Sequence, residues 1–359
     1  MSLVMKRLQV NLQLHTIKKK KRNNLQLKIS DQCSSFCYNL PKPSIVQEAD
    51  NFFLDFEKIC VLGHGNYGIV YKVRHKRISD IYALKIIRDI DCDSESQSTS
   101  PPSQETKILG FVDSPFVIKC HRIFEQLLPS SGGSKAILME YMDGGTLDTR
   151  RSFSESSLAH IACQVLKGLE YLHACNIVHL DIKPSNLLVD RDLNVKIADF
   201  GVSKIMSYMH GSDNYCDSAD VGTYAYMSPE RLDRDSCRYD PKYVYVGDVW
   251  SLGVTLLELF VGHFPFFRPE KKSISWMDLV MVTCLGEPLT SWCIPEEASE
   301  ELVSFIECCL EKDPSKRWTA SQLLKHPYVL SSFAWTLRLF DRFVFSIRKK
   351  QKKIDSSLH

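Results

Sequence analysis

The octapeptide HLDIKPSN, His179–Asn186, combines side chains that can support phosphoryl transfer. Asp181 is expected to accept the proton of an incoming hydroxyl, Lys183 to neutralise the transferring phosphoryl, and Asn186 to hold a magnesium ion. Further along, Asp199 opens the tripeptide Asp-Phe-Gly, and its carboxylate is expected to chelate magnesium that bridges nucleotide phosphates. The ordered series predicts transfer of a phosphoryl group from ATP with Mg²⁺.

A glycine-rich hairpin is predicted ahead of these residues, in LGHGNYGIV. Gly63, Gly65 and Gly68 make the pattern G-x-G-x-x-G, and Val70 follows them. A strand is expected on each side of the loop, where a dinucleotide-binding fold would need a helix after it, so the loop suits a flap over nucleotide phosphates. Small residues let the backbone N–H groups approach phosphate oxygens. Taken alone, the glycines are equally compatible with an ordinary hairpin.

Lys85 lies on the next predicted strand, in YALKII, at the position expected for a phosphate-binding lysine. Such a lysine needs a carboxylate partner on a helix, and Glu105 is the candidate. Pro101 and Pro102 precede Glu105, so this helix is not expected to start before them and should be short at that end. The sequence therefore predicts an ion pair carried by a weak helix.

The elements that must position these residues change type along the chain. The runs FEKICVLG, GIVYKVRH, IYALKIIR and KAILMEYM predict an antiparallel, β-rich first lobe. A helical second lobe is predicted after MDGGTL, where these apolar residues share one helix face: Leu158, Ile161, Ala162, Val165, Leu166, Leu169 and Leu172. Val246–Gly262 is apolar nearly all round and predicts a buried helix. The expected fold class is α+β, with a small β-rich N-lobe and a larger, mainly helical C-lobe.

Composition and charge limit the class of protein that could carry out this chemistry and the compartment in which it works. The chain of 359 residues has a net charge of +2, which gives no nucleic-acid-binding character. Its 13 cysteines are odd in number and lack C-x-x-C spacing, so neither a disulfide framework nor a zinc site is predicted. There is no run of eighteen apolar residues and no signal-peptide pattern. We therefore expect a cytoplasmic protein without a membrane partner.

The chain resembles the eukaryotic protein kinases, and in particular the plant-type mitogen-activated protein (MAP) kinase kinases. The residues that carry this resemblance are ILMEYMDGGTL, DIKPSNLL, KIADFGVSK, VGTYAYMSPERL, GDVWSLGV, ELFVGHFPF and DPSKRWTA. The resemblance implies a kinase domain at residues 51–330, divided into an N-lobe at 51–142 and a C-lobe at 143–330. It implies a dual-specificity enzyme that phosphorylates Ser/Thr and Tyr in the activation loop of a MAP kinase, below an upstream MAP kinase kinase kinase.

The resemblance also implies roles for individual residues. The residues implied to bind the nucleotide also include Leu62, Val70, Ala83, Met139, Glu140 and Met142. Met139 is expected to line the back of the adenine pocket, while the backbone of Glu140 and Met142 binds adenine. Asp248 is expected to brace the catalytic loop, and Arg317 to pair with Glu230.

Leu180 departs from the family pattern, which has an arginine before the catalytic aspartate. That arginine receives the phosphate placed on the activation loop through charge-assisted hydrogen bonds, which leucine cannot make. Loss of two such bonds, at about 1.5–3 kcal/mol each, should largely uncouple the switch. The proton-accepting Asp181 is retained.

The activation loop departs as well. Ser212 and Ser218 have the spacing of the family's phosphorylation sites but are displaced by one residue. An insertion in a flexible loop would let phosphorylation persist. Alternatively, Asp213, Asp217 and Asp220 would provide fixed charge. Either way, relaxed or rerouted control is predicted.

Two functions of different class stay open. The first is a kinase that is weakly or constitutively active on a MAP kinase. The second is a non-catalytic partner that binds a MAP kinase as scaffold or competitor. Because every group expected to touch the phosphoryl or the metal is present, the sequence favours the enzyme.

Basic tails flank the predicted domain, at residues 1–50 and 331–359. In the first, Lys6 and Arg7, then Leu12 and Leu14, resemble a MAP kinase docking peptide, in which cations steer the encounter and leucines fill pockets. A transit peptide is an alternative, and the run KKKKR also suits a nuclear address. The second tail predicts either an amphipathic helix for a membrane surface or partner, or a helix packed on the C-lobe.

Overall fold

The computed structural model describes residues 55–65, 68–87, 101–124, 135–148, 152–206, 224–232, 243–266, 275–286 and 293–330. All of them belong to one unit of the chain, Lys42–His359. The predicted docking arm, the serines Ser212 and Ser218, and the C-terminal tail lie outside the described residues.

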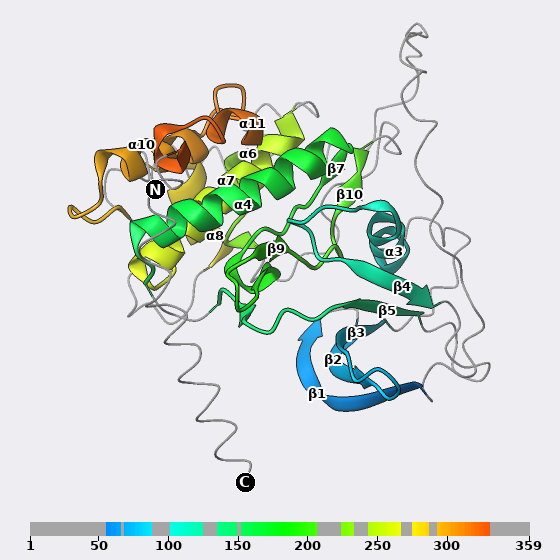
Figure 1. The fold of residues 1–359 in the computed structure, drawn as a ribbon. Helices are drawn as coiled ribbons and strands as arrows, with labels where there is room; N and C mark the ends of the chain where they lie inside the picture. The colour runs from blue at the N-terminus through cyan, green and yellow to red at the C-terminus, as the bar shows by residue number, and fades with distance from the viewer. Residues whose placement is uncertain are drawn as a thin grey trace, which may run out of the picture. The chain divides into compact units, whose positions relative to one another are not determined.

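An antiparallel sheet with the strand order β1-β2-β3-β5-β4 forms the N-lobe (Figure 1). Its strands are β1 (Phe56–Gly65), β2 (Gly68–His75), β3 (Ile81–Ile87), β4 (Cys120–Phe124) and β5 (Lys135–Glu140). Each run predicted to be β-rich is therefore a strand. In this register Lys85 stands opposite Val70 on β2 and Ile137 on β5, so it lies in the middle of the sheet.

Helix α3 (Pro101–Phe111) packs beside this sheet and carries Glu105. It begins at Pro101, where the missing N–H and fixed φ of proline are tolerated in the first turn. Glu105, Ile108 and Leu109 lie three and four positions apart, which places them on one face, and all three are buried. The burial of the two apolar residues thus turns Glu105 inward.

Two long helices, α4 (Glu155–Ala174) and α7 (Val244–Val261), lie side by side in the C-lobe (Figure 1). Ser154 caps α4 by accepting from the backbone N–H of Ser157, and Gly262 ends α7 with a left-handed φ of 82°. By length and composition α7 could cross a membrane, but 78% of that stretch is buried in the fold. It is a core helix, as predicted for Val246–Gly262.

Shorter elements complete the C-lobe. They are α6 (Pro229–Leu232), α8 (Trp276–Val280), the π-helix η6 (Met281–Leu285), α10 (Glu300–Cys309) and α11 (Ala320–Leu323). Between α4 and α6 lie β7 (Ile177–Val178), the 3₁₀ turn η3 (Pro184–Asn186), β8 (Leu187–Val189), β9 (Val195–Ile197) and β10 (Lys204–Ile205); β8 also pairs with β6 (Gly145–Thr146). Pairing of β8 with β9 sets Asn186 beside Ala198, whose N–H donates to the Asn186 carbonyl at 2.9 Å. The catalytic-loop residues and Asp199 are thereby brought together.

One continuous cluster of buried apolar side chains joins the lobes. It includes Ile108 from α3, Ile137 from β5, Leu256 from α7 and Phe305 from α10. The β-rich lobe and the helical lobe confirm the predicted α+β class.

Candidate active site

Lys85 connects three segments that are far apart in the sequence. Its Nζ donates to Glu105 Oε1 at 2.6 Å and to Asp199 Oδ1 at 2.9 Å. The Lys85 and Glu105 side chains are only 8% and 2% exposed, whereas that of Asp199 is 46% exposed. Asp199 therefore faces the accessible side of the group, where a ligand would arrive.

Electrostatics favour the charged forms of Lys85 and Asp199, whereas burial raises the pKa of Glu105. Burial works to lower the pKa of Lys85, but Glu105 and Asp199 outweigh it and raise that pKa above its usual value. Burial likewise works to raise the pKa of Asp199, and Lys85 outweighs it, so the carboxyl has a pKa below its usual range. At neutral pH a lysine cation and an Asp199 carboxylate face each other.

Asp181 sits in the catalytic loop with one oxygen engaged and one unpaired. Oδ2 accepts from Lys183 Nζ at 2.8 Å and from Asn186 Nδ2 at 2.8 Å. Oδ1 is buried and has no hydrogen-bond partner. An unpaired buried carboxylate oxygen is costly, and here it can accept the proton of a substrate hydroxyl.

The backbone of the catalytic loop is held by Asp248 of α7. Asp248 Oδ1 accepts from the Leu180 N–H at 2.8 Å, and Oδ2 accepts from the His179 N–H at 2.9 Å and from His173 Nε2 at 2.9 Å. Arg231 Nη1 donates to the Leu180 carbonyl at 3.0 Å. Leu180 has a φ of 68°, a left-handed conformation that costs about 1–3 kcal/mol for a non-glycine residue, so these bonds are what hold it.

The side chain of Leu180 lies in an apolar environment. It is 4% exposed and packs in a cluster with Val178 and Val244. Half-buried side chains also pack against this cluster, and one of them is Met206, which follows β10 at the start of the activation segment. The cation that lies beside this cluster, Arg231, contacts the carbonyl of Leu180 and not its side chain.

The glycine hairpin has the geometry of a close backbone flap. Gly65 pairs with Gly68 where β1 passes to β2. A Cβ added at Gly68 would lie 2.1 Å from the carbonyl oxygen of Ile86, so only glycine fits beside β3. At Gly63 a Cβ would meet nothing within 4 Å, which leaves that side of the strand open. Leu62 is 44% exposed on the same strand.

The residues predicted to contact adenine lie on β2, β3 and β5 and just after the end of β5. Ala83 stands opposite Met139, and Met139 and Met142 are buried, while Val70 packs against the main core. The side chain of Glu140 has a role that the sequence did not suggest. Its Oε1 accepts from Lys196 Nζ at 2.6 Å and from the Lys119 N–H at 2.7 Å, which ties the strand end to β9, three residues before Asp199.

The donor set at the loop fits magnesium. The Asn186 amide nitrogen is used by Asp181, which leaves its amide oxygen available, and Asp199 offers its second carboxylate oxygen. Among the described residues there is no group of three or more His, Cys, Asp or Glu side chains that could hold a metal alone. Magnesium typically takes one or two protein oxygens and completes its shell with phosphate and water. Asn186 and Asp199 match that requirement.

Arg317 and Glu230 form a buried ion pair in the C-lobe. Arg317 donates to both carboxylate oxygens of Glu230, at 2.7 and 2.9 Å, and both side chains are almost fully buried. Burial works to raise the pKa of Glu230, but Arg317 outweighs it and holds the pKa below its usual range. The pair fixes α6 against the segment that precedes α11.

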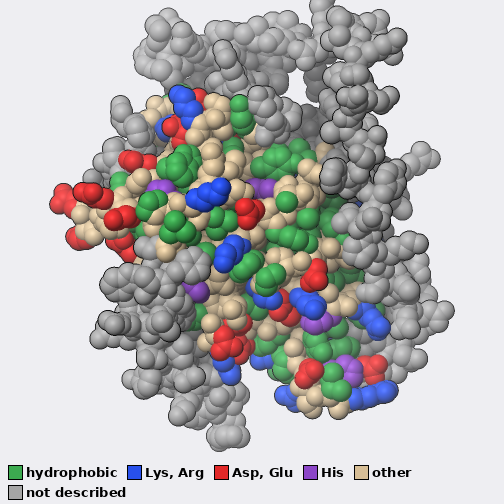
Figure 2. All heavy atoms as spheres, turned by 45° about the horizontal axis from the view of Figure 1, so that its top comes forward, with side chains coloured by type: hydrophobic (Ala, Val, Ile, Leu, Met, Phe, Trp, Pro, Cys, Tyr) green, Lys and Arg blue, Asp and Glu red, His purple; other side chains and the backbone are tan. Residues whose placement is uncertain are grey.

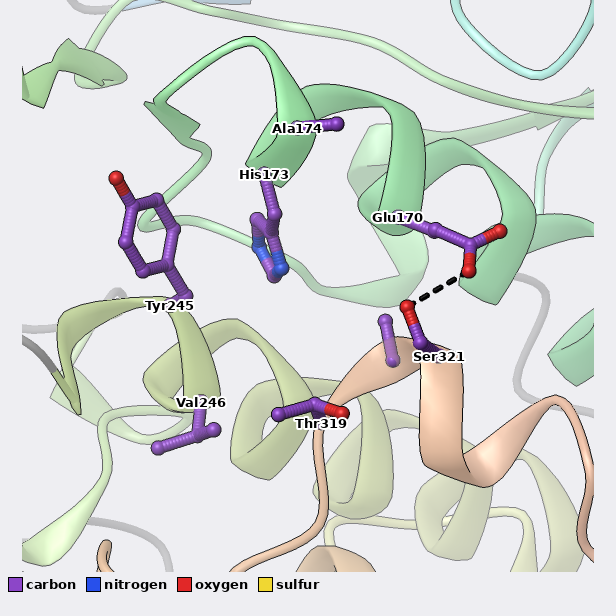
Figure 3. Close-up of a pocket in the computed structure, with 8 residues that line it drawn as sticks. Glu170, His173, Ala174, Tyr245, Val246, Thr319 and Ser321 are labelled. Carbon is purple, nitrogen blue, oxygen red and sulfur yellow. Dashed lines mark hydrogen bonds between the residues drawn. The ribbon is translucent and has the colours of Figure 1, made fainter.

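A cavity of about 490 Å³ is lined by residues of α4, α7 and the start of α11 (Figure 3). Glu170 and His173 on α4 face Tyr245 on α7 and Ser321 on α11, and the Ser321 hydroxyl donates to Glu170. His173, one of the residues that line this cavity, also forms a hydrogen bond with Asp248. None of the residues that line the cavity belongs to the Lys85 group or to the catalytic loop.

The structure brings Lys85, Glu105 and Asp199 together, and separately Asp181, Lys183 and Asn186, as the sequence predicts. Sequence reasoning missed three side chains that hold this arrangement: His173, Lys196 and Arg231. In the sequence, Lys196 could have been noticed only because it lies on the strand that leads to Asp199. Nothing in the sequence pointed to the roles of His173 and Arg231, which become visible only in the three-dimensional structure.

Comparison with known proteins agrees with this geometry. The family model described as "Protein kinase domain" matches residues 56–329. Mitogen-activated protein kinase kinase 9 of Arabidopsis thaliana is 52% identical, over 77% of this chain and 84% of that protein. Mitogen-activated protein kinase kinase 7 of the same plant is 50% identical, over 77% and 86%. The tobacco mitogen-activated protein kinase kinase SIPKK is 38% identical, over 80% and 77%.

Proposed function

Because the chain belongs to the plant MAP kinase kinases, a family of protein kinases, we propose that the residues described above carry out its phosphoryl transfer. The protein is a dual-specificity kinase that phosphorylates MAP kinases in signalling cascades.

Asp181 orients the acceptor hydroxyl of the MAP kinase and takes its proton on Oδ1. Lys183, already bonded to Oδ2, balances the charge that develops on the transferring group. Lys85 binds the phosphates of ATP, and Glu105 fixes its position. Asn186 and Asp199 would hold Mg²⁺, which neutralises phosphate charge when bound.

One observation supports this assignment above the others. Lys85 contacts Glu105 and Asp199 at once, so the N-lobe, α3 and the segment after β9 are in the arrangement that phosphoryl transfer requires. A scaffold that only binds a MAP kinase would not need a buried lysine with two carboxylate partners, whose desolvation is costly. The geometry therefore favours the enzyme over the non-catalytic alternative.

We propose that control of this kinase is relaxed. The support is the Leu180 side chain itself, which packs with apolar residues and cannot donate to a phosphate on Ser212 or Ser218 as an arginine would. Met206 packs against the same cluster, so the beginning of the activation segment is held by apolar contact instead. An upstream MAP kinase kinase kinase would then modulate activity rather than switch it on.

We propose that the arm docks the MAP kinase through Lys6, Arg7, Leu12 and Leu14, by charge steering and apolar pockets. We place the protein in the cytoplasm, with the basic run at 18–22 as an address for the nucleus. A peptide of residues 1–16 should compete with the full chain for the MAP kinase. A peptide in which both leucines are replaced by alanine is the matched control.

The decisive experiment uses the purified full chain, Mg²⁺-ATP and a MAP kinase whose own active site is disabled. Phosphate should appear on Ser/Thr and Tyr of its activation loop, and mass spectrometry maps the acceptors. Asp181→Ala is the control, because it removes the proton acceptor. Incorporation no greater than that of the Asp181→Ala control would overturn the assignment and support the scaffold.

A further inference from the structure

The cavity lined by α4, α7 and the start of α11 has an apolar side and a polar side, and we name it the α4–α11 cavity (Figure 3). The rings of His173 and Tyr245 lie together, with centroids 5.2 Å apart, and Val246 lines the same side. On the other side the Ser321 hydroxyl donates to Glu170 Oε1 at 2.7 Å, which leaves Oε2 available. Such walls suit an aromatic side chain that carries a hydrogen-bond donor.

The charge of the cavity limits its occupant. Glu170 is the one carboxylate among the eight lining residues, and none of the eight is a lysine or an arginine. An anionic occupant would therefore meet a charge of its own sign, whereas a neutral or basic one is favoured.

The C-terminal tail, residues 331–359, has matching chemistry. It carries seven Lys or Arg side chains against two Asp. Its aromatic side chains precede most of these cations, and they are Phe333, Trp335, Phe340, Phe343 and Phe345. Tryptophan is the one among these types whose ring carries an N–H donor.

The tail leaves the described part of the chain beside the start of α4. The Tyr328 hydroxyl donates to the Glu155 carbonyl at 2.8 Å, and Leu330, two residues later, is 53% exposed. Glu155 Oε1 also accepts from the Ser299 N–H at 2.9 Å, which brings the start of α10 to the same place. Acidic side chains are exposed there, namely Glu296, Glu297, Glu300 and Glu301 (Figure 2). A basic tail that begins beside an acidic surface is drawn towards this lobe.

The cavity is within reach of the tail. Glu170 follows Glu155 by fifteen residues on α4, so it lies about 22 Å further along the helix axis. An extended chain covers about 3.3 Å per residue, so about seven residues after Tyr328 span this distance. Trp335 stands at that position. A segment tethered to its site by a short linker binds at an effective concentration on the order of millimolar, so it outcompetes a free partner of equal affinity.

We propose that the α4–α11 cavity is a docking site for the C-terminal tail of the same chain. The Trp335 ring packs against His173 and Tyr245, and its indole N–H donates to Glu170. This inference goes beyond the proposed function and does not depend on it.

The docked tail supports the catalytic loop from a distance. His173 Nε2 is bonded to Asp248 Oδ2 at 2.9 Å, and the same oxygen accepts from the His179 N–H. A ring packed against His173 holds this imidazole in the orientation that contacts Asp248. Trp335 is thus a positioning residue, which acts on Asp181 through His173 and Asp248.

The test places the photoreactive amino acid p-benzoylphenylalanine at position 174 of the full chain. Ala174 lines the cavity and is exposed, and an alanine side chain has no hydrogen bond to lose. After irradiation, mass spectrometry should find cross-links to residues 331–345. The same amino acid at Ile78, which is 57% exposed on the N-lobe, is the control and should form none with the tail. In Trp335→Ala the yield from position 174 should fall about fivefold or more, because the aromatic anchor is lost, while Leu358→Ala should keep the wild-type yield.

A kinetic measurement tests the positioning role. On a MAP kinase whose own active site is disabled, Trp335→Ala should lower kcat about threefold and leave the KM for ATP unchanged. Trp335→Phe keeps a ring against His173 and should recover most of the lost kcat. A loss of kcat that Trp335→Phe does not recover, or an unchanged kcat in Trp335→Ala, would overturn this role.

The other results are equally decisive for the docking site. Absence of cross-links from position 174 to residues 331–359 would overturn it, and co-sedimentation of the full chain with phosphatidylserine vesicles would then assign the tail to a membrane surface. Cross-links found only between chains, in a mixture of isotopically labelled and unlabelled protein, would show that a second copy is the occupant and would overturn docking within one chain. A wild type that forms the cross-link but phosphorylates no MAP kinase would contradict the proposed function and leave the docking site standing.

Discussion

Asp248 fixes Leu180 through the main chain: the Leu180 N–H donates to Asp248 Oδ1 at 2.8 Å, while the leucine side chain packs with Val178 and Val244. Position 180 thus has two separate functions. Its backbone is part of the hydrogen-bond network that holds the catalytic loop, and we propose that its side chain sets how that loop responds to the activation segment.

The first prediction concerns Leu180→Arg. An arginine would restore a receiver for phosphate, with two charge-assisted bonds worth about 1.5–3 kcal/mol each. We expect kcat to rise by roughly 10²-fold or more only when the activation loop is phosphorylated. The unphosphorylated variant should be less stable than wild type, because a cation enters an apolar cluster. Kinase assays on phosphorylated and phosphatase-treated samples check this, with Leu180→Met as the control; no difference between the two samples would refute our account of Leu180.

The second prediction concerns Lys85→Met. Loss of the cation should reduce kcat by about 10²-fold or more and leave the carboxylates of Glu105 and Asp199 facing each other unpaired. Both carboxyl pKa values then rise, so the folded variant binds protons more readily than wild type does. The stability deficit of the variant should therefore be largest at pH 7 and shrink towards pH 5. Urea unfolding at both pH values measures it, and a deficit independent of pH would contradict the pairing.

The third prediction concerns the Glu230–Arg317 pair. Arg317→Ala leaves a buried carboxylate without its partner and should lower the free energy of unfolding by about 3–5 kcal/mol. Arg317→Lys should recover only part of this, because lysine cannot donate to both oxygens in the same way. A double-mutant cycle with Glu230→Gln isolates the coupling. Additive effects of the two single changes would show that the pair contributes nothing specific.

The fourth prediction is a dependence of stability on pH. Burial lowers the pKa of His179, whose Nε2 lies 3.1 Å from the Ala198 carbonyl. As pH falls below the ordinary histidine value, the unfolded chain takes up a proton that the folded protein refuses. Stability is therefore lost on acidification, by at most about 1.4 kcal/mol per pH unit for this residue. Between pH 6.5 and 5, the free energy of unfolding should depend less steeply on pH in His179→Asn than in wild type. In the exposed-site control His64→Asn this dependence should be the same as in wild type.

The fold followed from the sequence wherever local pattern decides structure. The β-rich runs and the glycine spacing predicted the hairpin of β1 and β2, and the apolar face of 158–172 predicted α4. The prediction that the helix carrying Glu105 does not start before Pro101 stays a prediction, because residues 88–100 lie outside the described part of the chain. Contacts between distant residues were predictable only where a family pattern pairs them, as for Lys85 with Glu105 and Glu230 with Arg317.

The remaining contacts depend on how the lobes pack. Glu140 meets Lys196 across 56 residues, and Arg231 reaches the Leu180 carbonyl across 51, and neither partner is set by a local period. The apolar surroundings of Leu180 were equally hidden, because Val244 comes from a helix 64 positions later in the numbering. A leucine at position 180 indicated that the arginine which binds the activation-loop phosphate is missing. The sequence did not indicate which residues the leucine side chain contacts instead.

The main-chain anchoring of position 180 bears on how such kinases diverge. Since Asp248 and Arg231 bond only to the N–H and carbonyl of this residue, these anchors of the catalytic loop do not depend on which side chain stands at position 180. Several arginine codons become leucine codons by a single base change. A lineage could therefore exchange one form of control for another in one mutational step, without passing through an ancestor that had lost its catalysis.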